Sequence, residues 1–194
     1  MRTVLGYVLN MLPYMLLMTP LYLLVRWGYR RLLCQNFLTN WYHEAGLLLF
    51  VLFLTGLASQ TIIPKLEFSE AGVHLMGYGG PLRINLIPFR IFFDSLREVG
   101  NGNALYVLIS LLGNIGIFVP VGFFFALLWH KKRFLRALFG GAGISLFIEL
   151  CQLPMSRATD IDDLILNTLG ALFGYILYSL LKKIAPSFIS RFEI

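Results

Sequence analysis

Five long apolar segments, separated by shorter polar stretches, dominate the pattern of the chain. They cover approximately residues 4–25, 45–63, 104–129, 134–153 and 161–181. Each is close to the roughly 20 residues with which an α-helix crosses a hydrocarbon core about 30 Å thick. Because backbone polar groups inside a bilayer must be satisfied within the protein, we expect five transmembrane helices. Pro13 and Pro20 interrupt the first segment, so we expect that helix to bend.

The longest stretch between these segments is residues 64–103, and it carries local structural signals of its own. LEFSEAGVHL alternates apolar and polar residues, and the GYGGP that follows shortly after it is a strong turn signal, so we expect a small hairpin. IFFDSLREV at residues 91–99 predicts a short amphipathic helix. Two placements remain open for this loop. It folds over the bundle as a lid, or it lies on the membrane surface with no role in a site.

The composition agrees with an all-α membrane protein. Hydrophobic residues make up 58% of the chain and charged residues only 13%, against about 25% charged in soluble domains. We therefore expect residues 1–194 to form a single integral membrane domain, a bundle of about five helices. The net charge of +6 does not indicate nucleic-acid binding, because the basic residues lie in clusters between the apolar segments. The lipid bilayer is the expected partner, and nucleic acid is not.

The basic clusters predict the orientation of the bundle. All three fall on the same side of a five-helix chain, and they comprise Arg26, Arg30 and Arg31, then Lys131, Lys132 and Arg133, then Lys182, Lys183 and Arg191. Short cytoplasmic loops carry an excess of Lys and Arg, so we expect the N-terminus outside and the C-terminus inside. We expect no cleaved signal peptide, because the first apolar segment is long and ends in arginines.

A group of polar residues interrupts the apolar pattern where the fourth and fifth segments meet, at Glu149, Gln152, Arg157, Asp160, Asp162, Asp163 and Asn167. Glu149 and Gln152 are spaced i, i+3, and Asp160, Asp163 and Asn167 follow i, i+3, i+7, so each set shares a helix face. An ionisable residue at membrane depth costs about 2.5–3.5 kcal/mol, so a helix retains it when it faces protein, water or a ligand. We expect these stripes to form a site at the external face.

Other residues define the surroundings of this site. Asn114 lies ten residues into the third segment, about 15 Å deep, and can lie beneath the carboxylates, with Ser110 one turn above it. Small residues continue both stripes and allow close helix approach, so we expect Glu149 and Gln152 to face Asp163 and Asn167; these small residues are Gly141, Ser145, Gly170 and Gly174. Asp162 points away from the main stripe, and it and Asp160 are also candidates to cap the fifth helix.

Several kinds of chemistry fit this group. Asp, Glu and Asn oxygens are hard ligands for a possible divalent cation, and a carboxyl such as Glu149 can act as a general acid or base. The fork of Arg157 suits phosphate, pyrophosphate or a carboxylate. A purely structural alternative stays open, in which Arg157 pairs with Asp160 or Asp163 and the remaining polar groups join the helices. The sequence has no P-loop, HExxH or CxxC motif, and Cys34 and Cys151 match neither a metal nor a disulfide spacing.

Three blocks of these residues resemble the VanZ family, membrane proteins named for teicoplanin resistance. They are Asn85-x-x-Pro88-Phe89, then Asn114-Ile-Gly-Ile-Phe118-Val-Pro120-Val-Gly122-Phe123, and then Glu149-x-x-Gln152 followed by Arg157-x-x-Asp160-x-Asp162-Asp163-x-x-x-Asn167-x-x-Gly170-x-x-x-Gly174. The resembling region covers residues 85–178. The resemblance implies a bacterial cytoplasmic-membrane protein linked to reduced susceptibility to glycopeptide antibiotics. It implies no particular reaction.

Two functions are compatible with this resemblance. In the first, an outer-leaflet site binds or modifies a lipid-linked envelope component, such as a cell-wall precursor or a lipoglycopeptide. The candidate catalytic residues are then Glu149, Asp163 and Arg157, and the candidate substrate-binding residues are Asn85, Asn114, Gln152, Asp160 and Asn167. In the second, the protein is a non-catalytic binder of a lipid or antibiotic, or a scaffold for a cell-wall synthesis enzyme. Cofactors are not predicted beyond the possible cation.

Overall fold

The computed structural model describes residues 4–33, 40–63, 65–69, 72–76, 83–100, 102–155 and 158–193. Five helices in this part of the chain are long and apolar enough to cross a membrane. They are α1 (Val4–Leu33), α2 (Trp41–Thr61), α4 (Ala104–Leu128), α5 (Arg133–Gln152) and α6 (Ile161–Ile184). The expected all-α membrane bundle is confirmed, and the chain is a multi-pass membrane protein.

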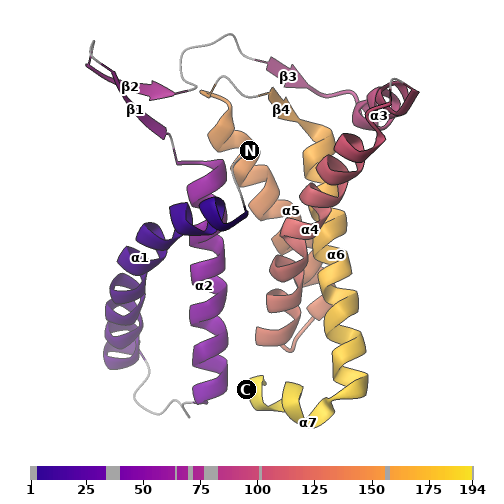
Figure 1. Ribbon diagram of the computed structural model, residues 1–194. Coiled ribbons are helices and arrows are strands. Elements are labelled where there is room, and N and C mark those ends of the chain that lie inside the picture. Colours follow the sequence, from indigo (N-terminus) through magenta and orange to yellow (C-terminus); the bar gives the residue numbers. More distant parts are fainter. Residues whose placement is uncertain are drawn as a thin grey trace.

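The five long helices run side by side, and the short elements gather at the two ends of the bundle (Figure 1). One end carries α3 (Arg90–Gly100) and four strands, β1 (Lys65–Ser69), β2 (Gly72–Met76), β3 (Arg83–Asn85) and β4 (Ala158–Asp160). The opposite end carries α7 (Pro186–Ile189) and the 3-10 turn η1 (Ser190–Phe192). We refer to these as the strand end and the C-terminal end.

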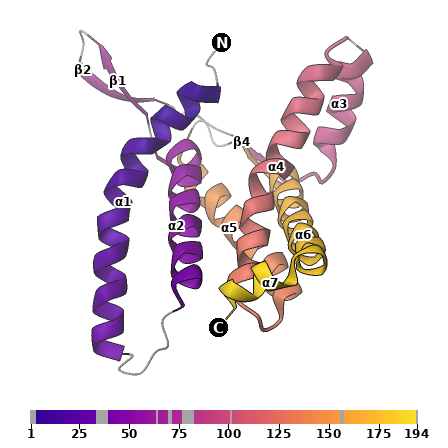
Figure 2. The same cartoon turned by 60° about the horizontal axis from the view of Figure 1, so that its bottom comes forward.

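Helix α1 packs against α2 at the outside of the bundle (Figure 2). It is bent, as expected, and Pro13 and Pro20 both lie inside it. A proline ring favours such a bend because it removes a backbone hydrogen-bond donor from the helix. It continues to Leu33, past the end predicted at residue 25, so Arg26 and Arg30 belong to the helix. These arginines are stabilised there by Glu44 of α2.

The closest helix contact joins α4 to α6. A Cβ atom built on Gly170 would overlap the carbonyl oxygen of Ile115, and one built on Gly174 would overlap that of Val119. Backbones approach this closely only where a side chain is missing. The two glycines therefore face α4, which corrects our expectation that they continue the surface facing α5. Against α5, the small residue of α6 is Ala171, whose Cβ lies beside Gly141.

The loop between α2 and α4 folds largely as its sequence pattern predicts. β1 and β2 pair as an antiparallel hairpin, and α3 is the expected amphipathic helix. The pattern did not predict that β3 pairs in parallel with β4, which joins this loop to the α5–α6 turn. Each of these strands has only three residues, too few to show an alternating pattern.

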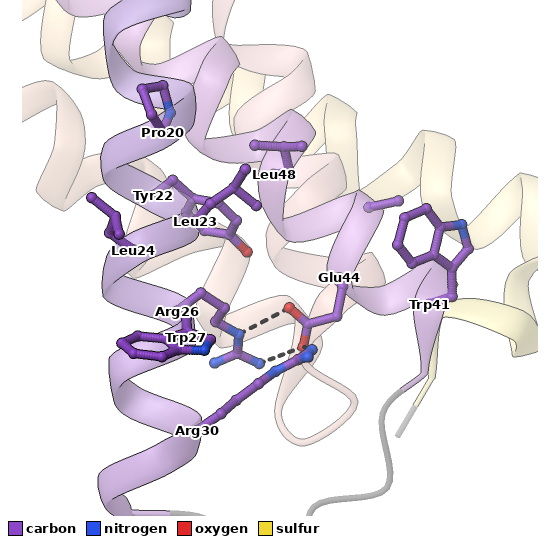
Figure 3. A pocket seen from close by; sticks show the side chains of 11 residues that line it. Pro20, Tyr22, Leu23, Leu24, Arg26, Trp27, Arg30, Trp41, Glu44 and Leu48 are labelled. Atoms are coloured by element: carbon purple, nitrogen blue, oxygen red, sulfur yellow. Dashed lines mark hydrogen bonds and ion pairs between the residues drawn. The ribbon is translucent and has the colours of Figure 1, made fainter.

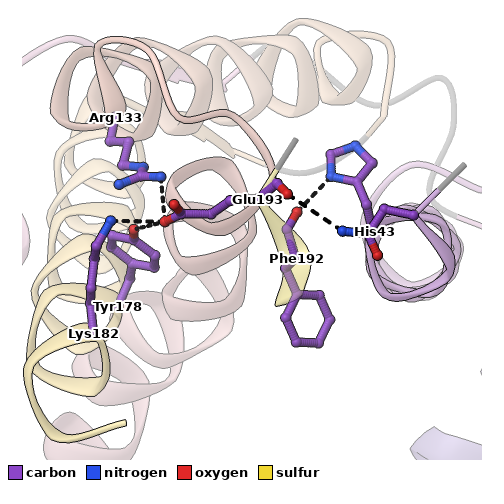
Figure 4. A network of polar contacts seen from close by, with 7 residues as sticks. His43, Arg133, Tyr178, Lys182, Phe192 and Glu193 are labelled. Atoms are coloured by element: carbon purple, nitrogen blue, oxygen red, sulfur yellow. Dashed lines mark hydrogen bonds and ion pairs between the residues drawn. The ribbon is translucent and has the colours of Figure 1, made fainter. Parts of the chain in front are cut away.

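The C-terminal segment folds back across the other end of the bundle (Figure 4). Glu193 Oε1 accepts hydrogen bonds from Arg133 Nη2 at 2.6 Å and Lys182 Nζ at 2.8 Å, which links it to α5 and α6. His43 Nδ1 of α2 donates to the carbonyl oxygen of Phe192 at 2.9 Å. The segment therefore ties three of the long helices together at the C-terminal end.

Candidate functional site

Polar side chains from α4, α5, α6 and the strands come together at the strand end of the bundle. The described members of this group, which we call the Glu149 cluster, are Asn85, Asn114, Glu149, Asp160, Asp162, Asp163 and Asn167. The prediction for Arg157 lies outside the described residues, as do Ser156 and the side chain of Ser110.

Glu149 lies in the last turn of α5 and is 5% exposed. Its Oε2 accepts a hydrogen bond from the backbone N–H of Asp160 at 3.1 Å. The hydroxyl of Thr159 donates to the backbone carbonyl of Glu149 at 3.4 Å. The end of α5 is thus fixed to the residues that begin α6. The charges of Asp160 and Asp163 lie within electrostatic reach of this buried carboxyl group.

Asp160 begins α6 and also contacts the loop. As the N-cap residue, it accepts at Oδ1 from the backbone N–H of Asp162 at 2.9 Å, so its expected capping role is confirmed. The same Oδ1 accepts from Asn85 Nδ2 at 2.9 Å. Asn85 in turn accepts at Oδ1 from the backbone N–H of Ile87, which orders the chain just after β3. Asn85, which was predicted to bind substrate, therefore connects the loop to Asp160.

Asp163 and Asn167 extend the cluster along one stripe of α6 and contact different neighbours. Asn114 Nδ2 of α4 donates to Asp163 Oδ1 at 2.6 Å, so Asn114 contacts one of the carboxylates. Asn167 is buried, and its Nδ2 donates to Ser145 Oγ of α5 at 3.0 Å. The stripe of α6 therefore contacts two different helices, one through each residue.

Gln152 does not join this stripe. It is buried at the end of α5, and its Nε2 donates to the backbone carbonyl of Thr61 in α2 at 3.1 Å. We had expected Gln152 to face Asp163 and Asn167. The contact with Thr61 instead satisfies a carbonyl in the last turn of α2, which has no partner within its own helix. This correction gives Gln152 a position between α5 and α2.

Asp162 is the residue of this group that sequence reasoning interpreted least well. It is 2% exposed, and its Oδ1 accepts from the backbone N–H of Phe89. Its Oδ2 accepts from the backbone N–H of Ile91 at 2.7 Å. These two donors lie at the start of α3, so a carboxylate of α6 caps another helix. Phe89 has a positive φ of 64°, uncommon for a residue with a side chain, and Asp162 helps to hold it there.

No signal in the helical periodicity identifies this role, because Asp162 lies away from the main stripe.

The chemical capacity of the cluster follows from these groups. The carboxyl group of Glu149 lies close enough to those of Asp160 and Asp163 for their charges to interact, and Asp163 lies within the same reach of Asp160 and Asp162. Among the described residues, no group of three or more His, Cys, Asp or Glu side chains has a geometry that could hold a metal ion. The arrangement can exchange a proton through a carboxyl group and can accept hydrogen bonds from a polar head. Whether a cation takes part stays a prediction.

Comparison with known proteins supplies one match. The family model described as VanZ/LLP1 matches residues 45–182, which is more than half of the chain. The match includes α2 from Ala45 onward and all residues of the Glu149 cluster. No curated protein and no solved structure matches the chain.

Proposed function

Because the chain belongs to the VanZ/LLP1 family, we propose that it acts in the bacterial cytoplasmic membrane to reduce glycopeptide susceptibility, above all to teicoplanin. The Glu149 cluster binds or modifies a lipid-linked envelope component, either a cell-wall precursor or a lipoglycopeptide. The observation that carries this proposal is the grouping of Glu149, Asp160 and Asp163 at one end of the bundle.

Joining helices through a group of carboxylates has a high free-energy cost. Each ionisable residue in a membrane-spanning helix costs about 2.5–3.5 kcal/mol near the bilayer centre and less toward the end. Repulsion among Glu149, Asp160 and Asp163 adds to this cost. The small residues of α4, α5 and α6 already allow close packing without any charge. We infer that the carboxylates are retained for a ligand or a reaction, with Glu149 as the acid or base.

The basic residues support an external position for the cluster. The described basic residues at the C-terminal end include Lys131, Lys132, Lys182 and Lys183, and this end is opposite the cluster. Under the positive-inside rule that end faces the cytoplasm. The cluster then lies at the outer leaflet, where lipid-linked wall precursors are used and where lipid-anchored glycopeptides act.

One observation favours a second candidate, a non-catalytic binder or scaffold. The described partners of Asn114 and Asn167 are side chains of neighbouring helices, and those of Asp162 are backbone groups of the loop. Such a network fixes the shape of the strand end. In this second function, the cluster positions the external loop, and the loop or the apolar helix faces bind the lipid, the antibiotic or a wall-synthesis enzyme.

Teicoplanin susceptibility tests the proposal. We would compare a host without the protein with hosts that make wild type or Glu149→Gln at equal membrane levels, with Glu98→Gln as the control for loss of a carboxylate outside the Glu149 cluster. The site proposal predicts that wild type and Glu98→Gln raise the inhibitory concentration and that Glu149→Gln does not. Full protection by a folded Glu149→Gln protein would favour the scaffold. No protection by wild type would contradict a resistance role in that host.

A further inference from the structure

A second feature of the molecule lies far from the Glu149 cluster, in the groove between α1 and α2 (Figure 3). The groove has a volume of about 840 Å³. Its length is lined by apolar side chains, among them Leu23, Leu24 and Leu48. Toward the C-terminal end of the bundle it becomes polar, at Tyr22, Arg26, Arg30 and Glu44.

The polar part of the groove carries an excess of positive charge. Arg26 binds Glu44 in a bidentate manner, from Nε to Oε2 at 2.9 Å and from Nη2 to Oε1 at 2.6 Å. Arg30 Nη2 lies 2.9 Å from the same Oε1. Among the described residues that line the groove, Glu44 is the only acidic one, so two guanidinium groups share one carboxylate and the net charge of these groups is +1.

The same residues have more hydrogen-bond donors than acceptors. Arg30 Nε and the hydroxyl of Tyr22 are buried, and neither has a hydrogen-bond partner in the described part of the protein. A buried donor without a partner is costly, and an uncompensated charge near a bilayer is more so. A ligand that supplies acceptor oxygens and one negative charge would accept from the unpartnered donors and neutralise the excess positive charge.

The surroundings indicate what kind of molecule brings that charge. Trp27 and Trp41 border the polar part and are 57% and 79% exposed. Exposed tryptophans concentrate at the depth of lipid head groups. The apolar part of the groove continues from there along α1 and α2 toward Pro20 and Leu48, in the direction an acyl chain takes from its head group (Figure 3).

We propose that the α1–α2 groove binds one anionic phospholipid. An acyl chain lies along Leu23, Leu24 and Leu48, and the phosphate lies at Arg30, between the two tryptophans. A basic pocket between transmembrane helices is suited to an anionic head group. The polar residues of this groove precede residue 45, where the family match begins. The head-group part of the lipid site therefore lies outside the family match, whereas Leu48 of the apolar part lies inside it, and the site does not depend on the function of the Glu149 cluster.

Native mass spectrometry of the full-length protein tests this proposal. The protein would be stripped of lipid in detergent and titrated with phosphatidylglycerol or with phosphatidylcholine that has the same acyl chains. Two variants address the two parts of the site: Arg30→Gln removes the excess charge, and Leu23→Trp narrows the apolar part while leaving the charges unchanged. Arg136→Gln is the matched control, because Arg136 is an exposed arginine at the same end and does not line the groove.

We expect wild type and Arg136→Gln to retain one phosphatidylglycerol in preference to phosphatidylcholine. Arg30→Gln should weaken phosphatidylglycerol binding about fivefold, the effect of about 1 kcal/mol per basic residue near an anionic surface. Leu23→Trp should weaken binding of both lipids, and it keeps the test valid if Arg30→Gln does not fold. Equal retention of the two lipids by wild type would overturn the proposal, as would unchanged phosphatidylglycerol binding in both groove variants. Competition by soluble glycerol phosphate at the concentration of the lipid would show an anion site without a lipid groove and would also overturn it.

Discussion

Asn85 Nδ2 donates to Asp160 Oδ1 at 2.9 Å, and the same two residues are partners in the parallel pairing of β3 with β4. Seventy-five positions separate them in the sequence. One residue belongs to the loop between α2 and α4, and the other begins α6. The contact therefore joins the first and third blocks of motif residues, and it holds the loop against the Glu149 cluster.

Replacing Asn85 tests this connection. Asn85→Ala removes one hydrogen bond to a carboxylate, so we expect the free energy of unfolding to fall by about 1.5–3 kcal/mol. The reduction should appear as a lower thermal unfolding midpoint of the purified protein. Asn103→Ala is the control, because exposed Asn103 also donates to a carboxylate, that of Glu98, at 2.7 Å. Equal effects of the two changes would show that the Asn85–Asp160 contact has no special role.

Asp162 is expected to be the most sensitive polar position at the strand end. Asp162→Ala leaves the backbone N–H groups of Phe89 and Ile91 without their acceptor, and each lost charge-assisted bond costs about 1.5–3 kcal/mol. We expect α3 to loosen, so limited proteolysis should cleave residues 83–100 faster than in wild type. Glu98→Ala removes a half-buried carboxylate of α3 that does not accept from these two N–H groups, so it should raise the cleavage rate less than Asp162→Ala. Unchanged cleavage in Asp162→Ala would contradict the capping role.

The contact of α4 with α6 predicts opposite results for two glycines. Gly170→Ala places a methyl group against the carbonyl oxygen of Ile115, and we expect a loss of about 1–3 kcal/mol through overpacking. At Gly143 a Cβ atom meets nothing within 4 Å, so Gly143→Ala should be neutral or stabilise the helix by about 0.5–1 kcal/mol. Thermal unfolding in one detergent would measure both. A tolerated Gly170→Ala would mean that the two helices can separate at little cost.

Glu193 predicts how acid affects the C-terminal end. Burial raises the pKa of this carboxyl group, but the hydrogen bond from Lys182 and the charge of Arg133 more than offset it, and the net pKa lies below its ordinary value of 4.5. A lowered pKa gives stability that is fully present above the unfolded value and is lost as pH falls through the folded value.

As the pH is lowered below about 4.5, we therefore expect the thermal unfolding midpoint of wild type to decrease more steeply than that of Glu193→Gln. At neutral pH, where the two ion pairs are intact, wild type should be the more stable protein. Glu98→Gln corrects for the loss of a carboxyl group elsewhere in the chain. Parallel pH curves for wild type and Glu193→Gln would rule out this contribution.

The elements of the bundle could be predicted because their signals are local. The apolar runs define α2, α4, α5 and α6 to within a few residues, and alternation and amphipathicity define the hairpin and α3. The predicted end of α1 was too early, because the arginines that follow residue 25 pair with Glu44 of α2. No local pattern reports such a partner.

The candidate site could be predicted as a group but not in its contacts. Helical spacing placed Asp163 and Asn167 on one stripe, but it could not show that they contact α4 and α5 respectively. It also could not show that Gln152 contacts α2 or that Asp162 caps α3. Periodicity specifies the face of a helix, whereas the neighbour on that face depends on how all helices pack.

Under the proposed function, Glu149 belongs to a site that acts on an envelope component. The most direct measurement is mass spectrometry of membrane lipids and wall precursors from hosts that lack the protein, make wild type, or make Glu149→Gln at matched levels. Glu149→Gln is almost isosteric and removes the ionisable group, so its effect reports on chemistry more than on packing.

We predict that one lipid-linked species changes in abundance with wild type and returns to the level of the empty host with Glu149→Gln. The same conversion should be reproduced by purified wild type in liposomes, which excludes an indirect effect. Identical lipid and precursor profiles in all three hosts, together with equal teicoplanin protection by both proteins, would contradict a catalytic Glu149 and leave the scaffold as the account of the Glu149 cluster.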